Sequence, residues 1–103
     1  MESAFQYVID NGLTNSNAYP YKARDQTCAY QGGGEVTISG FNSVATKSDA
    51  ALQAAITSGP VAVAIHAGAF GFQFYSSGII TSNCVADTVP QLDHGVTAIG
   101  FGT

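Results

Sequence analysis

The chain has 103 residues, of which 46% are hydrophobic and 10% are charged, and its formal net charge is −4. This composition argues against an intrinsically disordered chain, because disorder goes with low hydrophobicity and high charge. The three basic residues are scattered, which argues against nucleic acid and anionic membranes as partners, since both bind positive patches. No apolar run approaches the ~20 residues that cross a bilayer. The sequence therefore favours a small globular domain.

A stripe of apolar side chains at helical spacing predicts a helix over residues 2–11 that packs into a core. The stripe consists of Ala4, Phe5, Val8 and Ile9. Gly12 is expected to end this helix, because glycine commonly follows the last helical turn. Further along, alternating apolar and polar residues predict a strand over residues 35–41.

Residues 46–49 resemble a capping box, with aspartate in place of the usual glutamate or glutamine, and predict the start of a second helix. That helix is expected to end at residues 58–60. The unbroken apolar run 61–65 is typical of a strand buried on both faces. Residues 78–80 and 95–101 are further strand candidates. A helix followed by a strand-rich body indicates an α+β fold.

The end of the chain places His94 just before an apolar, strand-like run. A strand can aim such an imidazole into a cleft while its alternate residues anchor in the core. Neutral histidine is also well suited to take a proton from a nucleophile near neutral pH. The alternative is a surface or hydrogen-bonded structural histidine. His66, at the end of the run 61–65, has no surrounding motif and is expected to be a polar residue where the strand leaves the core.

Five segments in order resemble the papain-like cysteine proteases, most closely the cathepsin L type. These segments are residues 1–8, Tyr19-Pro20-Tyr21 followed by Cys28, residues 59–65, residues 74–79 followed by Cys84, and Asp93-His94-Gly95. The resemblance runs nearly from end to end of the chain. Each segment alone would be weak, and their common order makes the resemblance specific.

The resemblance implies part of a papain-like fold. Residues 1–18 would end the helical left-hand domain, and residues 19–103 would form part of the right-hand β-barrel domain that carries the catalytic histidine. The expected activity is peptide-bond hydrolysis by acyl transfer to a cysteine outside this chain. In the family, that cysteine and an oxyanion-binding glutamine lie upstream, and an asparagine that orients the histidine lies downstream. The isolated chain is therefore expected to be inactive.

By the same resemblance, His94 would be the general base and acid of the reaction. Met1, Ala64 and Leu92 would line the pocket for the second residue before the cut bond, and Gly95 would leave room for the substrate backbone. Flexible apolar side chains and one small residue make a roomy apolar pocket. Each of these residues could equally belong to the core.

Cys28 and Cys84 are the two cysteines of the chain. From the residues alone they could be buried thiols or one disulfide, and two cysteines so far apart make a poor zinc site. The resemblance implies a third answer, in which both are half-cystines whose partners lie outside this chain. No metal or cofactor is expected.

Asp93 adjoins His94, but neighbours along a strand point to opposite faces, so Asp93 is expected to be a rim carboxylate that does not orient the imidazole. Expected partners are protein or peptide substrates, with a propeptide or protein inhibitor of the complete enzyme. The expected location is lysosomal, vacuolar or secreted, with the targeting segment outside this chain. Two alternatives stay open: a non-proteolytic homologue, silicatein-like or acting in a matrix or in binding, and an unrelated interaction module.

Overall fold

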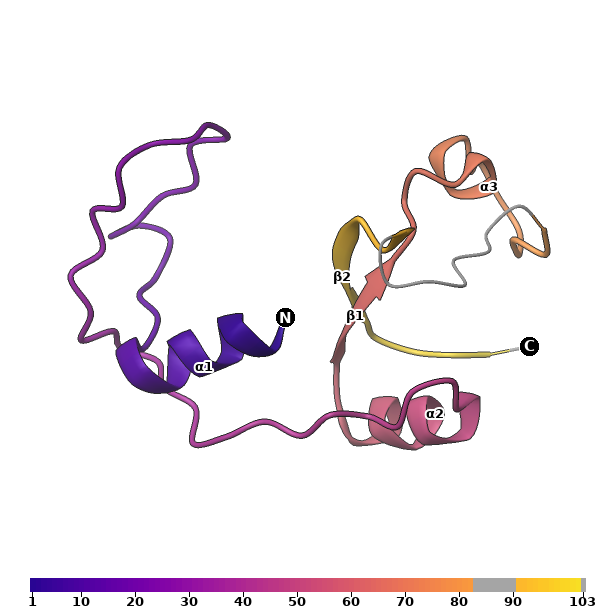
Figure 1. Cartoon of the computed structure of the whole chain (residues 1–103), viewed down its shortest axis with the longest axis horizontal. Helices are drawn as coiled ribbons and strands as arrows, with labels where there is room; N and C mark the ends of the chain where they lie inside the picture. Colours follow the sequence, from indigo (N-terminus) through magenta and orange to yellow (C-terminus); the bar gives the residue numbers. More distant parts are fainter. Residues whose placement is uncertain (83–90, 103) are drawn as a thin grey trace. The chain divides into compact units, whose positions relative to one another are not determined.

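A computed structural model describes residues 1–82 and 91–102 of the chain. It contains two compact units, Met1–Ser43 and Val44–Thr103, and each is described by itself. The first unit holds helix α1 (Glu2–Asn11), and the second holds α2 (Asp49–Ser58), β1 (Val61–Ile65), α3 (Phe70–Gln73) and β2 (His94–Ala98) (Figure 1). Helices and an antiparallel strand pair fit the predicted α+β class. The partial β-barrel domain and the domain boundary between residues 18 and 19 stay predictions.

Helix α1 has the predicted limits. Gly12 follows it with a φ of 75° and donates its backbone N–H to the carbonyl of Val8. This positive φ is the conformation that favours glycine at a helix end. The predicted burial of the apolar stripe is wrong within this chain: Phe5 is half-buried, Ala4 is exposed, and no residue of α1 is fully buried.

The strand predicted over residues 35–41 is absent, and a single antiparallel bridge between Leu13 and Val36 takes its place. Each of these residues donates its N–H to the carbonyl of the other, at 2.7 and 3.0 Å. Beside the bridge, a Cβ on Gly12 would lie 3.1 Å from the nitrogen of Gly34. The two glycines therefore allow the backbone after α1 to pass close to the later loop.

Aromatic side chains fill much of the space in the first unit. The ring of Tyr30 lies 6.4 Å from that of Tyr7 and 6.1 Å from that of Tyr19, measured between centroids. The Tyr30 hydroxyl also donates a hydrogen bond to the carbonyl of Asn11 at 3.1 Å. The half-buried ring and the hydroxyl of Tyr30 thus hold the long loop against the end of α1.

Helix α2 begins at Asp49, and its N-cap lies two residues after the predicted cap at Thr46. Ser48 is the N-cap, and its Oγ accepts a hydrogen bond from the N–H of Ala51 at 3.2 Å. The serine hydroxyl satisfies one of the free N–H groups of the first turn. The helix ends at Ser58, as predicted, and Gly59 caps it.

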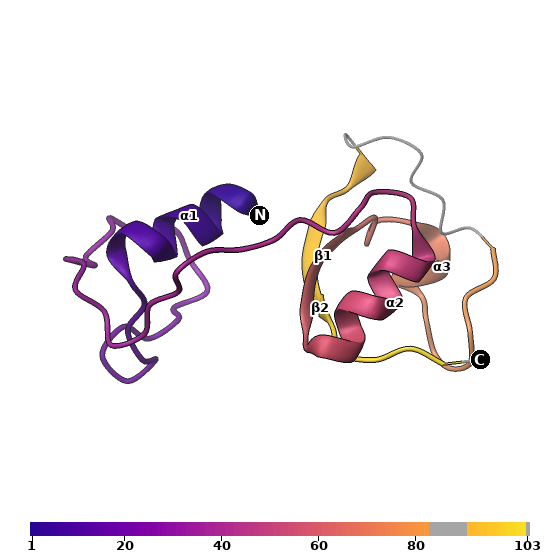
Figure 2. The same cartoon turned by 90° about the horizontal axis from the view of Figure 1, so that it is seen from below.

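Strands β1 and β2 pair in antiparallel fashion, with Ile65 opposite His94 and Val61 opposite Ala98 (Figures 1 and 2). The predicted strand 61–65 is confirmed, but its predicted burial on both faces is wrong. Alternate residues of β1 are half-buried and exposed. One face of the strand pair therefore points toward the second unit's own side chains and the other is open to solvent.

The remaining strand predictions hold only in part. Residues 78–80 do not form a strand, and the segment predicted over 95–101 forms a strand over His94–Ala98. Between the two strands lies the single turn of α3, preceded by Ala69, which is the buried hydrophobic residue of the described chain. In the part of the chain that the structure describes, no helix is long and apolar enough to span a membrane.

Candidate functional site

His94 is the first residue of β2 and stands opposite Ile65, the last residue of β1. Its side chain is exposed, and among the described residues its imidazole has no hydrogen-bond partner. An exposed imidazole at the end of a strand pair is free to meet a group supplied from outside this unit. The backbone of His94 is held by the pairing of β2 with β1, which defines the point from which the imidazole projects.

Two predicted pocket residues, Ala64 and Gly95, lie directly opposite each other in the strand pair. Both are exposed. Because side chains alternate along a strand, Ala64 and Gly95 belong to the face opposite to that of His94 and Ile65. A cleft that used all three predicted residues would pass around the end of the strand pair.

The other two predicted pocket residues lie outside the strands. Leu92 precedes His94 by two positions, and 37% of its surface is exposed. Met1 is the N-cap of α1 and is 54% exposed, and it belongs to the first unit. The structure therefore places Ala64 and Gly95 on one face of the strand pair and His94 on the other, with Leu92 two positions before His94 in the chain. A common pocket of these residues, and a role for Met1 in it, stay predictions.

The Asp93 carboxylate binds the backbone just after β1. One oxygen accepts the N–H of Ala67 at 2.7 Å, and the other accepts the N–H of Gly68 at 3.1 Å. The hydrogen bond from Ala67 is the main cause that lowers the pKa of Asp93. Desolvation opposes it, and the hydrogen bond from Gly68 and the nearby His66 make smaller contributions that lower the pKa further. We call these three residues, Ala67, Gly68 and Asp93, the carboxylate clamp.

Because the carboxylate is engaged in the clamp, it does not hydrogen-bond the imidazole of His94. The prediction that Asp93 does not orient the imidazole thus agrees with the geometry. The hydrogen-bond partners of the carboxylate were not predicted from the sequence. The signal that could have pointed to them is the pair of small residues, Ala67 and Gly68, after a strand end, where backbone N–H groups lack ladder partners.

His66 directly follows β1 and is half-buried. Its Nδ1 atom is buried and has no hydrogen-bond partner among the described residues. Its Nε2 lies near Gly68, where an added Cβ would approach it to 3.4 Å. His66 therefore lies beside the carboxylate clamp, at the point where the chain emerges from the end of β1.

The thiol of Cys28 is free and exposed in the first unit. It lies within electrostatic reach of Tyr7, whose pKa is raised first by desolvation and then by the charges of Cys28 and two neighbouring tyrosines. Cys84 lies outside the described residues. The half-cystine roles of both cysteines stay predictions.

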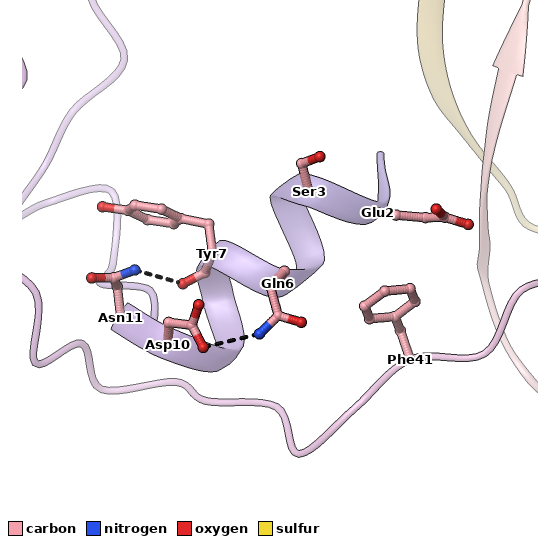
Figure 3. A pocket seen from close by; sticks show the side chains of 7 residues that line it. All are labelled: Glu2, Ser3, Gln6, Tyr7, Asp10, Asn11 and Phe41. Carbon is pink, nitrogen blue, oxygen red and sulfur yellow. Dashed lines mark hydrogen bonds between the residues drawn. The ribbon is translucent and has the colours of Figure 1, made fainter.

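A hollow of about 480 Å³ lies along α1 in the first unit (Figure 3). Its lining consists of Glu2, Ser3, Gln6, Tyr7, Asp10, Asn11 and Phe41. Both of its carboxylates already accept hydrogen bonds, Glu2 from Ser43 and Asp10 from Gln6. None of the predicted site residues lines it. Within residues 1–82 and 91–102, no cluster of three or more histidine, cysteine, aspartate or glutamate residues could hold a metal.

Comparison with known proteins gives a family match over the whole chain. The model of the papain family cysteine proteases matches residues 1–103. A senescence-specific cysteine protease of Oryza sativa subsp. indica is 41% identical over 103 residues, which are 99% of this chain and 29% of that protein.

Two further relatives have similar identity. The cysteine endopeptidase RepA of Oryza sativa subsp. japonica is 43% identical over 105 residues, covering 99% of this chain and 27% of its own length. Vignain of Phaseolus vulgaris is 42% identical over 106 residues, covering 100% of this chain and 28% of its own length. The chain thus spans less than a third of the curated relatives it matches.

Proposed function

Because the chain belongs to the papain family of cysteine proteases, we propose that it is the histidine-bearing part of a cysteine endopeptidase. The observation that carries the proposal is the position of His94. It is exposed at the start of β2, at the end of a strand pair whose register fixes its backbone. A family match over all 103 residues supports reading that histidine as the family's catalytic one.

In this proposal His94 accepts the proton of a cysteine thiol supplied by a part of the protein outside this chain. The resulting thiolate attacks the carbonyl carbon of the scissile peptide bond, because the thiolate is the reactive form of cysteine. The same imidazolium then gives its proton to the leaving amine. Water hydrolyses the acyl-enzyme in the second half of the reaction, with His94 again acting as base.

The substrate side of the proposal uses the apolar residues near His94. Leu92 and Ala64, together with Met1, would line the pocket for the second residue before the cut, and Gly95 would leave room for the substrate backbone. The exposure of Ala64 and Gly95 on one face of the strand pair supports this role, since a substrate-binding wall is open to solvent before the substrate arrives.

The wider architecture follows the same proposal. Residues 1–18 would complete a helical domain, and residues 19–103 would form part of a β-barrel domain. The half-cystines Cys28 and Cys84 would pair with cysteines outside the chain. Substrates would be proteins or peptides, the natural antagonists would be a propeptide or a protein inhibitor, and the location would be vacuolar, lysosomal or extracellular.

The test is a His94→Ala substitution in a protein that joins this chain to the family's cysteine-bearing and asparagine-bearing segments. We expect peptide cleavage to fall at least about a thousandfold, because thiolate formation and amine protonation fail together. The matched control is His66→Gln, at the only other histidine of the chain, which should cleave at close to the unsubstituted rate.

An unchanged rate in the His94→Ala protein would contradict the proposal. Reaction with a thiol-directed covalent inhibitor supplies a second measurement. If the joined protein binds peptides but neither cleaves them nor reacts with the inhibitor, the non-proteolytic alternative is correct. Two of the three relatives above are named as a cysteine protease and a cysteine endopeptidase, which favours the proteolytic alternative.

A further inference from the structure

The register of β1 against β2 determines the position of His94. The solvent-exposed face of the strand pair does little to determine that register. That face carries only small side chains on the two strands, Ala62 and Ala64 facing Thr97 and Gly95. Strands with such uniform faces specify their pairing weakly. A slip by two residues keeps every side chain on its face and moves His94 by roughly 7 Å along the strand.

Three hydrogen bonds at one end of the pair resist such a slip. The N–H of Asp93 donates to the carbonyl of Ile65 at 3.1 Å. The Asp93 carboxylate receives the N–H groups of Ala67 and Gly68. These contacts form only when Ile65 stands opposite His94, so the carboxylate clamp selects the observed register at the residue next to the histidine.

Gly68 contributes to the clamp because it has no side chain that would block the Asp93 carboxylate. A Cβ placed on Gly68 would lie 2.9 Å from the Oδ2 atom of Asp93, closer than real Cβ contacts allow. Gly68 is not among the glycines with a positive φ, so its backbone would accept an alanine. The obstacle to a side chain at position 68 is therefore the Asp93 carboxylate itself.

We propose that Gly68 is a positioning residue for His94, acting through the Asp93 carboxylate. Its lack of a side chain lets the carboxylate approach both N–H groups, and the clamp then holds the start of β2 in register. The catalytic part of this inference rests on the proposed function. Displacing a catalytic group by about 1 Å can cost two orders of magnitude in rate, so a positioning contact this close to the imidazole has a measurable effect.

A double-mutant cycle tests the proposal, using Gly68→Ala, Asp93→Ala and the combined variant. The control is Gly100→Ala in the same unit, where an added Cβ meets nothing within 4 Å. The structural readout is the amide proton chemical shift of residue 67 in the joined protein. Hydrogen bonding to a carboxylate shifts this resonance, and the readout requires no catalysis.

We expect Gly68→Ala and Asp93→Ala each to move the residue 67 amide resonance to the same unbonded position. The combined variant should match Asp93→Ala, because with the carboxylate gone the new methyl group meets only the ring of His66, at an ordinary contact distance of 3.4 Å. Independent effects would instead add. Additive shifts, or an unchanged resonance in Gly68→Ala, would overturn the clamp mechanism whatever the activity of the complete protein.

The catalytic readout uses the joined protein with its active sites titrated by a covalent thiol reagent, so that loss of folded protein does not count as loss of rate. We expect Gly68→Ala to lower kcat about tenfold with KM within about twofold, since a displaced base slows chemistry more than binding. The combined variant should be no slower than Asp93→Ala. A normal kcat in Gly68→Ala with a lost amide shift would show that the clamp does not position His94. A joined protein without any cleavage would refute the proposed function and leave the amide result to decide the clamp.

Discussion

The neighbouring residues Asp93 and His94 have different surroundings, because the Asp93 carboxylate is hydrogen-bonded and the His94 side chain is exposed. The sequence predicted His94 as the base from its setting, and it predicted that Asp93 would not orient it. What it could not predict is that the Asp93 carboxylate binds the N–H groups of Ala67 and Gly68. Those residues lie far away in the chain, and only the pairing of β1 with β2 brings them close.

The residues of the proposed pocket predict the substrate preference of the complete enzyme. Met1, Ala64 and Leu92 carry no charge, and a buried cation without a partner is costly. We therefore expect Leu or Phe to be preferred over Arg at the second position before the cut. A peptide library varied at that position measures this preference, and Arg exceeding both by more than about tenfold, or about 1.4 kcal/mol, would contradict the pocket assignment.

Substitutions at two alanines on one face of β1 test where the proposed pocket lies. Ala64→Leu should reduce cleavage of peptides with Phe at that position by filling the space the ring needs. Ala62→Leu is the matched control, because Ala62 is exposed on the same face of β1 but stands two residues further from the His94 end. Equal effects of the two substitutions would show that Ala64 does not border the pocket.

The Asp93 pKa predicts how the carboxylate clamp depends on pH. Because the pKa is lowered in the folded chain, the clamp contributes stability above the ordinary aspartate pKa of about 3.9 and loses it as the pH falls through the lowered value. We expect the amides of Ala67 and Gly68 to keep their protection from hydrogen exchange from pH 7 to about pH 4. That protection should vanish in more acidic solution.

The matched variant for the pH experiment is Asp93→Asn, which cannot titrate and offers one acceptor in place of two. Its two amides should show low protection at every pH. Loss of protection well above pH 4 in the unsubstituted chain would contradict the assignment of the acceptor to Asp93.

At the scale of elements, local sequence signals predicted the limits of helices and strands, but they did not predict which strands would pair. Helix α1 and strand β1 have their predicted limits, because Gly12 ends the helix and the Gly59-Pro60 pair precedes the strand. The strand predicted over residues 35–41 has the right alternation, but its neighbour provides only the bridge at Leu13. A strand needs a partner along its length, and alternation alone does not show whether one exists.

The cap of α2 gives a quantitative test at this scale. Ser48→Ala removes the oxygen that accepts the N–H of Ala51 and should cost the helix about 0.5–2 kcal/mol. Faster hydrogen exchange at the Ala51 amide measures this loss. Ser58→Ala serves as control, since that hydroxyl ends the same helix with a long 3.5 Å contact to Ala54; if both substitutions act alike, Ser48 is not the cap.

For the whole molecule, the chain leaves much of its apolar surface in solvent. Among the described residues, Ala69 is the single buried hydrophobic residue, while Phe70, Ile79 and Ile99 are each more than two thirds exposed. Composition predicted a globular domain with a modest core, and burial falls short of that prediction. Burial depends on which surfaces meet, and hydrophobic content alone does not determine it.

We expect the isolated 103-residue chain to unfold over a broad range of denaturant and to bind a hydrophobic dye before denaturant is added. It should also fail to cleave peptides, because no base acts without its nucleophile. Circular dichroism and dye fluorescence over one urea titration check the first expectation. A sharp transition without dye binding, or turnover blocked by a thiol reagent, would contradict this account of the chain.

The antiparallel pairing of β1 with β2 has a consequence for how the chain is made. A ribosome adds Val61–Ile65 before His94–Ala98, and at about 5–20 residues per second the first strand leaves the ribosome seconds before the second. During those seconds the helices can form, since local contacts need no distant partner. The apolar strand has no partner in the chain and is available to bind a chaperone or another nascent chain. The clamp closes the loop between the two strands, so synthesis of Asp93 marks the earliest moment at which this exposure can end.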